Sequence, residues 1–345
     1  MNGPWQSRRP MGVLGMGSAL PGDPVSTDAL IALLACRFGF ARARMAGSIA
    51  DRMGVRSRHV ARPFAEPIEV ARSGHSNADL AAAAVRAALD EAGVAIGDIG
   101  YLIAHTTTPG LALPGNVALV ADLIGYEGPH IELRQACTGF ANALMIAAGL
   151  LLADPERPVV IVGSETGSLF LDPRSLAGDS GQIVNMVQMG DGAGAIVLGK
   201  ADGATDRIEA AWFGARGLGR APGISMAQGA RHFEHDFAGI RATGHRLFEG
   251  GRDAAAALGH SIDGADWIVP HQVSGRIGAQ VAEYFGLNPA RMFVNADRLG
   301  NTGSAAIWLA LDALRRGPIA RGETAVVLGA EASKHMYGGL AYGHG

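Results

Sequence analysis

The sequence contains two similar series of segments about half a chain apart. The run PVVIVGSE ends at Glu165, and the run ETAVVLGAE ends at Glu331, 166 residues later. The run IGYLIAH ends at His105 and ADWIVPH ends at His271, again 166 residues apart. Segments that match in the same order at one offset favour a duplicated structural unit. We therefore expect two similar halves, residues 10–172 and 173–345.

A third pair of matching segments contains side chains that can take part in catalysis. Ala136-Cys137-Thr138-Gly139 precedes one helical pattern and Gly300-Asn301-Thr302-Gly303 precedes another, an offset of 164. If the halves pack about a pseudo-twofold axis, Cys137 and Asn301 begin equivalent helices near the junction. His271 then ends a strand beside them, so the repeat predicts three reactive side chains in one region.

Helix-like and strand-like segments alternate, which indicates a layered α/β fold. Glycine makes up 50 of the 345 residues, and this predicts many tight turns and close backbone approaches. The helical patterns are 78–92, 139–153, 272–285 and 304–315, and the strand-like runs between them are 100–104, 159–162, 193–198, 267–269 and 324–328.

Cys137 is the first candidate for catalysis. It follows the strand-like run Ile131-Glu132-Leu133 and precedes a long apolar helical pattern. A thiol at a helix N-terminus faces the positive end of the helix dipole, which favours the thiolate. The alternative is a buried structural cysteine, since free cysteine is among the residue types most often buried.

His271 and Asn301 are the other two candidates. An imidazole near a cysteine nucleophile can activate it or donate a hydrogen bond to its products. The Asn301 amide can donate to a developing oxyanion. The alternatives are a structural histidine at a strand end and a helix N-cap, a position that asparagine fills well.

Other features exclude whole classes of function. A formal net charge of −3 gives no indication of nucleic-acid binding. The apolar run 143–153 is too short to span a bilayer, and no signal peptide is evident, so we expect a cytoplasmic protein. His232 and His235 have a metal-like spacing but lack a further ligand set, so we interpret them as part of a solvated loop and expect no metal. Gly217-Leu218-Gly219-Arg220 is interpreted as a loop, and no cofactor is expected.

At this point the sequence resembles the β-ketoacyl-acyl-carrier-protein synthase III family over nearly its whole length. The resemblance lies in GDGAGAIVLG (190–199), DWIVPHQVSGRI (266–277), GNTGSAAIWLAL (300–311) and the surroundings of Cys137. It implies a thiolase fold with α-β-α-β-α layers, a homodimer, and the catalytic set Cys137, His271 and Asn301.

The resemblance also implies a two-step reaction. Cys137 takes an acyl group from a thioester of coenzyme A or of an acyl carrier protein. A malonyl thioester then loses carbon dioxide and attacks the acyl-cysteine, with its oxyanion held by His271 and Asn301. The backbone amide of Cys137 and one near Gly329-Ala330 are expected to form the first oxyanion hole, and Arg52 and Arg276 to bind the thioester donor.

Several positions depart from the pattern of the bacterial fatty-acid members, and most of them concern the entrance for the donor. We therefore expect free coenzyme A thioesters to be poor donors and the role to lie in a secondary pathway. The departures are Ser48 for an adenine-stacking tryptophan, Ser180 for an arginine, Glu249 for a lysine, Ser274 for an asparagine and 329–333 for a glycine-rich end.

Two alternatives to a condensing enzyme stay open. One is an acyltransferase of the same fold that passes the acyl group to an oxygen or nitrogen of a small molecule. The other is a non-catalytic partner subunit of a heterodimer, although such subunits usually lose the nucleophile.

Overall fold

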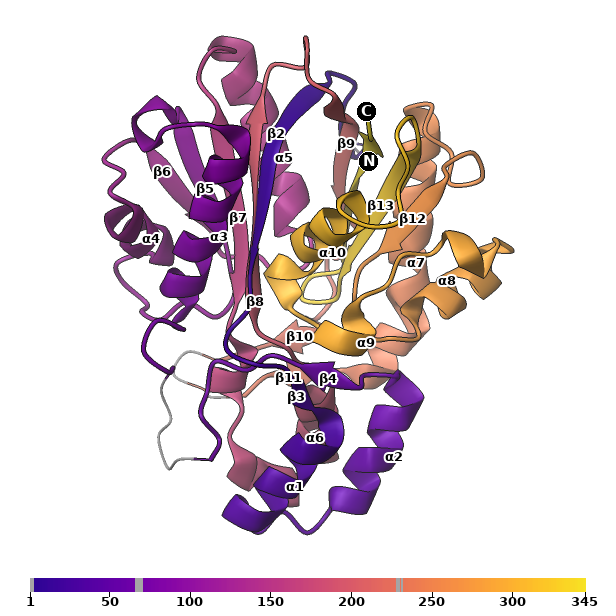
Figure 1. Cartoon of the computed structure of the whole chain (residues 1–345). Coiled ribbons are helices and arrows are strands. Elements are labelled where there is room, and N and C mark those ends of the chain that lie inside the picture. Colours follow the sequence, from indigo (N-terminus) through magenta and orange to yellow (C-terminus); the bar gives the residue numbers. More distant parts are fainter. Residues whose placement is uncertain (1–2, 66–70, 228–229, 231) are drawn as a thin grey trace.

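The computed structural model describes residues 3–65, 71–227, 230 and 232–345, and it forms one layered α/β body (Figure 1). Its central sheet has ten strands and consists of two halves, each a mixed arrangement of parallel and antiparallel neighbours. The N-terminal half has the order β2-β8-β7-β5-β6. Its strands are β2 (Met11–Ala19), β5 (Tyr101–His105), β6 (His130–Leu133), β7 (Val159–Glu165) and β8 (Gly192–Gly199).

The C-terminal half repeats this topology. Its strands have the order β9-β14-β13-β12. The single bridge between Ile268 of β12 and Met292 is the counterpart of the pairing between β5 and β6 in the first half. The two halves join through three antiparallel residue pairs of β2 and β9. Its strands are β9 (Asp206–Ala215), β12 (Trp267–Pro270), β13 (Thr324–Glu331) and β14 (Met336–Gly343), with β1 (Trp5–Ser7) paired to β9.

Helices cover both outer faces of the sheet halves and fill the space between them. In the central layer α5 contacts β7 and also β9 and β14 of the other half, while α10 contacts β8 and β2. This gives the expected α-β-α-β-α order of layers. The outer helices are α3 (Asn77–Ala92) and α4 (Asn116–Ile124) on one side and α7 (Phe237–Ala257) and α8 (Ile277–Phe285) on the other, and the central ones are α5 (Gly139–Ala153) and α10 (Ala306–Arg315).

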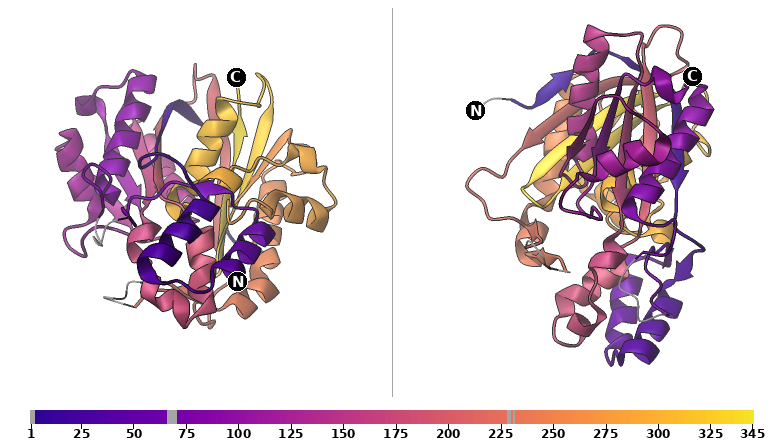
Figure 2. Two further views of the ribbon diagram at one scale, coloured as in Figure 1. Left: turned by 60° about the horizontal axis from the view of Figure 1, so that its bottom comes forward. Right: turned by 90° about the vertical axis from the view of Figure 1, so that its left-hand side faces the viewer.

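A smaller helical unit lies beneath the sheet, at the bottom of Figure 1 and forward in the left view of Figure 2. Its own apolar core includes Leu34, Phe64 and Met186. The sequence analysis did not predict it. Its helices are α1 (Thr27–Phe38), α2 (Ala43–Met53) and α6 (Ser180–Gln188).

The remaining short elements lie in various parts of the chain. They are β3 (Val25–Ser26), β4 (Ser57–Arg58), β10 (Ile224–Ser225), β11 (Glu234–His235), α9 (Ala296–Leu299) and the 3₁₀ turns Ile96–Asp98, Gly167–Phe170, Pro173–Ala177, Pro289–Arg291 and Gly303–Ala305.

Two sequence-based expectations need correction. The boundary between the halves at residue 172 is too early, because β8 pairs with β7 and β2 of the N-terminal half. The helix expected to start at Gln272 starts at Ile277. The Gln272 side chain is buried and bonds the backbone of Pro270 and Asn295. These bonds hold Gln272 in a loop that precedes the helix.

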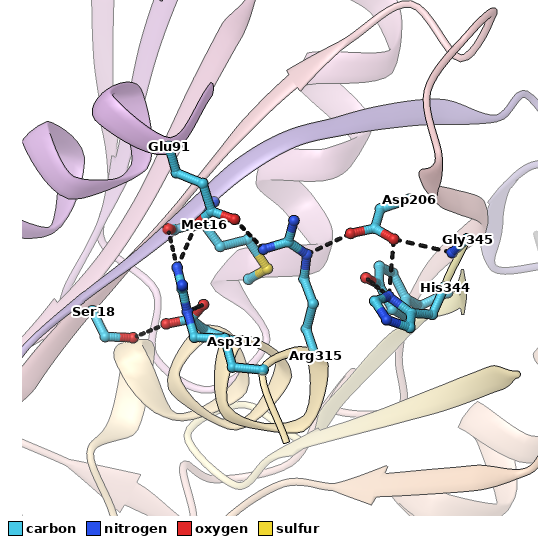
Figure 3. Close-up of polar contacts among 10 residues, drawn as sticks. Met16, Ser18, Glu91, Asp206, Asp312, Arg315, His344 and Gly345 are labelled. Atoms are coloured by element: carbon cyan, nitrogen blue, oxygen red, sulfur yellow. Dashed lines mark hydrogen bonds and ion pairs between the residues drawn. The ribbon is translucent and has the colours of Figure 1, made fainter. Parts of the chain in front are cut away.

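A network of charged side chains ties the layers together near the end of α10 (Figure 3). Arg315 bonds Asp206 at the start of β9 and Glu91 on α3, and Arg316 bonds Glu91 and Asp312. Burial alone would raise the pKa values of Glu91 and Asp206, but the hydrogen bonds and charge of Arg315 hold both below their usual values. The network therefore joins helix layers and strands of both halves.

Candidate active site

Cys137 lies in the tight turn that leads into α5. The turn closes with a 2.9 Å bond from the Gly139 amide to the Ala136 carbonyl. Gly139 is required here, because a Cβ atom at this position would lie 2.5 Å from Nδ1 of the His105 ring. His105 is itself fixed behind the turn, where its Nε2 accepts a 3.0 Å bond from the Trp308 indole. Packing from both halves thus sets the position of the cysteine.

A cavity of about 130 Å³ opens beside Cys137. Asn301 from the other half lines the same cavity, as the repeat predicts. The rest of the wall is largely apolar and includes Phe170, Met189 and Phe233. A mostly apolar space next to a thiol suits an acyl chain.

Asn301 lies in the turn before α10 and bonds backbone groups through both its own backbone and its side chain. Its backbone amide donates to the Gln188 carbonyl at 2.7 Å, and its Oδ1 accepts a 3.0 Å bond from the Gly303 amide. The side chain therefore caps the turn before α10. Because Oδ1 faces Gly303, the NH₂ end of the side chain is the end that can donate into the cavity.

His271 directly follows β12, and its backbone amide donates to the Leu328 carbonyl at 2.8 Å. The side chain is buried, and Nδ1 has no hydrogen-bond partner among the described residues. Burial lowers the pKa of His271 to about 4, so the ring is neutral at neutral pH. His271 is not part of the cavity wall; it connects to that wall through Val273, whose carbonyl accepts a bond from the cavity residue Gln188.

Two buried glutamates flank the nucleophile turn, and their arrangement follows the repeat. Glu331, at the end of β13, accepts bonds from the backbone and hydroxyl of Thr138, directly before α5. Glu165, at the end of β7, accepts a 2.6 Å bond from Ser304, just before α10. Each carboxylate therefore binds the start of the other half's central helix. From the sequence, both glutamates were identified only as strand ends. Their offset of 166 residues, which is the offset of the repeat, was the signal that could have indicated equivalent roles.

The electrostatics around Cys137 oppose the thiolate. Burial raises the pKa of the thiol well above its usual value, and the charges of Glu331 and Glu165 raise it further. Burial also raises the pKa of Glu165, while its bonds from Ser304, Thr107 and Thr108 act in the opposite direction. The helix-dipole argument alone predicts a lowered pKa, so this expectation was wrong.

The remaining expected residues lie outside the cavity. Arg52 is exposed and bonds the Ser48 carbonyl of its own helix. Arg276 packs against Gly54 and lines a separate polar depression of about 770 Å³ together with Arg56 and Asp297.

The turn expected at Gly329-Ala330 is not present. Strand β13 continues to Glu331, Ala330 pairs with Tyr337 of β14, and residues 332–335 make the turn. The oxyanion role expected for the Ala330 amide stays a prediction, and the turn itself follows Glu331.

The segment interpreted as a solvated loop also needs correction. His235 belongs to β11 and lines the cavity, with its ring stacked on Phe237 at 4.9 Å. His232 stays at the surface near Glu234. No cluster of metal-ligating side chains occurs within the part of the chain that the structure describes. None of the helices described is long and apolar enough to cross a membrane.

Comparisons with known proteins agree with the fold and the arrangement of this site. Residues 131–217 match the family model for 3-oxoacyl-[acyl-carrier-protein] synthase III, and residues 255–340 match the model for its C-terminal part. The β-ketoacyl-[acyl-carrier-protein] synthase III of Sphingopyxis alaskensis is 33% identical over 340 residues, covering 95% of this chain and 96% of the relative.

Solved structures give the same picture. The tetronic acid condensing enzyme AbyA1 superimposes with a TM-score of 0.82 at 30% identity, covering 96% of this chain and 99% of that one. The priming β-ketosynthase of a polyketide biosynthetic pathway has a TM-score of 0.75 at 29% identity, covering 99% and 97% of the two chains.

Proposed function

Because the chain belongs to the β-ketoacyl-[acyl-carrier-protein] synthase III family, we propose that it carries an acyl group on Cys137 and condenses it with a malonyl thioester. The observation that carries the proposal is the position of Cys137 in a fixed turn at the wall of a partly open, mostly apolar cavity shared with Asn301. The similar priming ketosynthase and condensing enzyme favour a secondary-metabolite pathway.

In the first step, the sulfur of Cys137 attacks the donor carbonyl. The thiol proton leaves with the donor, which departs as free coenzyme A thiol or free carrier thiol. The product is an acyl-cysteine thioester whose chain occupies the apolar part of the cavity. The backbone amide of Cys137 stabilises the oxyanion of the tetrahedral intermediate.

In the second step, the malonyl thioester loses carbon dioxide to give an enolate. Its carbon attacks the acyl-cysteine, and the thiolate of Cys137 leaves and takes up a proton. The neutral imidazole of His271 and the amide of Asn301 hold the enolate oxygen. His271 must reach that oxygen from outside the present cavity wall, so this role requires a substrate that extends toward Val273.

The test of this proposal is a two-step experiment on one sample. The acyl-enzyme is first prepared with a thioester donor and freed of excess donor. Malonyl thioester is then added, and the products are followed by mass spectrometry. We expect a β-ketoacyl thioester and one carbon dioxide for each acyl group discharged. Discharge without carbon dioxide would contradict decarboxylative condensation.

Acyl transfer to an oxygen or nitrogen is the second candidate. The similar enzyme AbyA1 is described as tetronic acid condensing, and a tetronic acid is a cyclic ester, so its formation needs a C–O bond as well as a C–C bond. This candidate predicts that alcohols or amines discharge the acyl-enzyme while malonyl thioesters leave it intact. The same sample distinguishes the two reactions.

Removing the charge of Arg276 is expected to weaken use of donors that carry a phosphate. Substitution Arg276→Ala should raise KM for an acyl-carrier-protein or acyl-coenzyme A donor by about tenfold, because one charge-assisted contact to phosphate is lost. The rise should be smaller for an acyl thioester of N-acetylcysteamine, which has no phosphate. The control is Arg86→Ala. Arg86 lies on α3, bonds the carbonyl of Leu123 and does not line the depression that holds Arg276. Equal losses for all donors would contradict this role.

A further inference from the structure

The carboxylate of Glu331 occupies the start of the helix that follows Cys137. Its Oε2 accepts a 2.9 Å bond from the backbone amide of Thr138 and a 2.7 Å bond from its hydroxyl. Its Oε1 accepts a bond from the hydroxyl of Ser333. The side chain is only 2% exposed. Three donors are therefore directed at its two oxygens, and both oxygens act as acceptors.

This position changes the electrostatic character of the helix start. An unoccupied N-terminus of α5 would present partial positive charge to the neighbouring thiol and favour the thiolate. Glu331 binds this end of the helix and offsets the dipole with a full negative charge. Because the site is buried, the interaction is screened far less than at the surface.

The other titratable groups around the turn do not supply a compensating positive charge. Burial is the largest cause of the raised pKa of Cys137, Glu331 comes next, and Glu165 from the end of β7 has the same sign and adds to both. His105, packed against Gly139, has a pKa lowered by burial to about 3, and His271 has one lowered to about 4. Both rings are neutral at neutral pH. The charged groups that face the thiol are therefore negative.

We propose that Glu331 is a positioning residue for the nucleophile: it anchors the backbone next to Cys137 and keeps the resting sulfur a thiol until a thioester donor arrives. The inference rests on the proposed function in that Cys137 is the acyl carrier. The proton balance fits: in acylation the thiol proton leaves with the donor thiol, and after condensation the released thiolate takes a proton from solvent and becomes a thiol again. A resting thiol is also protected from alkylation and oxidation, since the thiolate is the reactive form.

The experiment measures the thiol directly and does not depend on acyl transfer. Cys36 is exposed, so the parent protein carries Cys36→Ser, which leaves Cys137 as the only cysteine. The rate of alkylation by iodoacetamide is followed by intact mass as a function of pH. Substitution Glu331→Gln keeps the shape and an acceptor oxygen but removes the charge. We expect the midpoint of its pH profile to fall by about one pH unit or more, which is about a tenfold change in thiol acidity.

Two further variants separate charge from packing. Asp312→Asn removes another buried carboxylate, on α10, which bonds Ser18 of β2 and Arg316 just after the helix, and should leave the midpoint unchanged. Glu331→Asp keeps the charge but shortens the anchor, so it should keep a high midpoint while slowing acylation. The proposal is overturned if the Glu331→Gln profile superimposes on the parent profile. It is also overturned if Glu331→Asp lowers the midpoint as much, because packing would then explain the effect.

Failure of the proposed function would look different. A parent protein that is alkylated normally but takes no acyl group from any thioester would refute acyl transfer. The alkylation profiles would still decide whether Glu331 controls the thiol.

Discussion

Replacing Cys137 by alanine is expected to abolish the acyl-enzyme, with a loss of acyl transfer of at least about a thousandfold, as for nucleophiles removed from other enzymes. The reason is that Cys137 is the thiol at the cavity wall, and the thioether of Met189 in the same wall cannot be acylated. Cys36 lies on α1, in the separate helical unit, and is exposed. The measurement is intact mass after incubation with a panel of acyl thioesters of coenzyme A, of an acyl carrier protein and of N-acetylcysteamine.

The matched control is Cys36→Ser, which should acquire the same added mass as the wild type. An adduct that persists in Cys137→Ala would mean that another residue carries the acyl group. An enzyme that takes no acyl group from any donor would favour the interpretation of this chain as a non-catalytic partner subunit. A mass found with carrier-bound donors but not with coenzyme A would agree with the altered donor entrance at Ser48 and Ser180.

The expected chemistry of Cys137 is that of a neutral pair. Many cysteine enzymes activate the thiol as an ion pair with a nearby histidine. Here the pKa of Cys137 is raised and that of His271 is lowered to about 4, so both groups are uncharged at neutral pH. A neutral imidazole can still donate one hydrogen bond, and this is the form that stabilises an enolate oxygen.

Much of the frame of this site could be predicted from the sequence because the repeat is strong. The helix that follows Cys137 has the predicted bounds, Gly139–Ala153, and β7 and β13 begin where expected. The apolar strands are buried on both faces and therefore give continuous apolar runs. Cys137 and Asn301 meet at one cavity for the same reason: equivalent segments of a duplicated fold come together at its axis.

The features that were missed depend on contacts between distant residues. The link from Glu331 to Thr138 spans 193 positions, and no local pattern reports it. His235 reaches the cavity because β11 pairs with β10 and is covered by Phe237, while its local sequence is polar and resembles a loop. The sign of the pKa shift at Cys137 also depends on such contacts. A local rule, the helix dipole, gives the opposite answer.

The substitution with the largest expected effect on stability is at Arg315, the last residue of α10. Substitution Arg315→Met should lower the free energy of unfolding by about 3 kcal/mol, because the buried carboxylate of Asp206 loses its arginine and keeps only its bonds to His344 and the Gly345 amide. The side chain of Asp206 is 4% exposed and lies 2.5 Å from Nε of Arg315. Glu91 would lose one of its two arginines, which joins α3 to α10 (Figure 3). The measurement is urea unfolding at a fixed protein concentration, since association would change the apparent stability.

The loss of stability caused by Arg315→Met is expected to depend on pH. Asp206 and Glu91 have pKa values below their usual range, so their contribution is present above the ordinary carboxyl pKa of about 4 and is lost as the pH falls through the lowered values. The difference between wild type and Arg315→Met should therefore shrink in acid. Arg207→Met is the matched control on β9: its pair with Glu209 is solvent-exposed, so its loss should cost less than about 1 kcal/mol at any pH. If Arg315→Met proved no more harmful than Arg207→Met, the network would be a surface feature that does not hold the layers together.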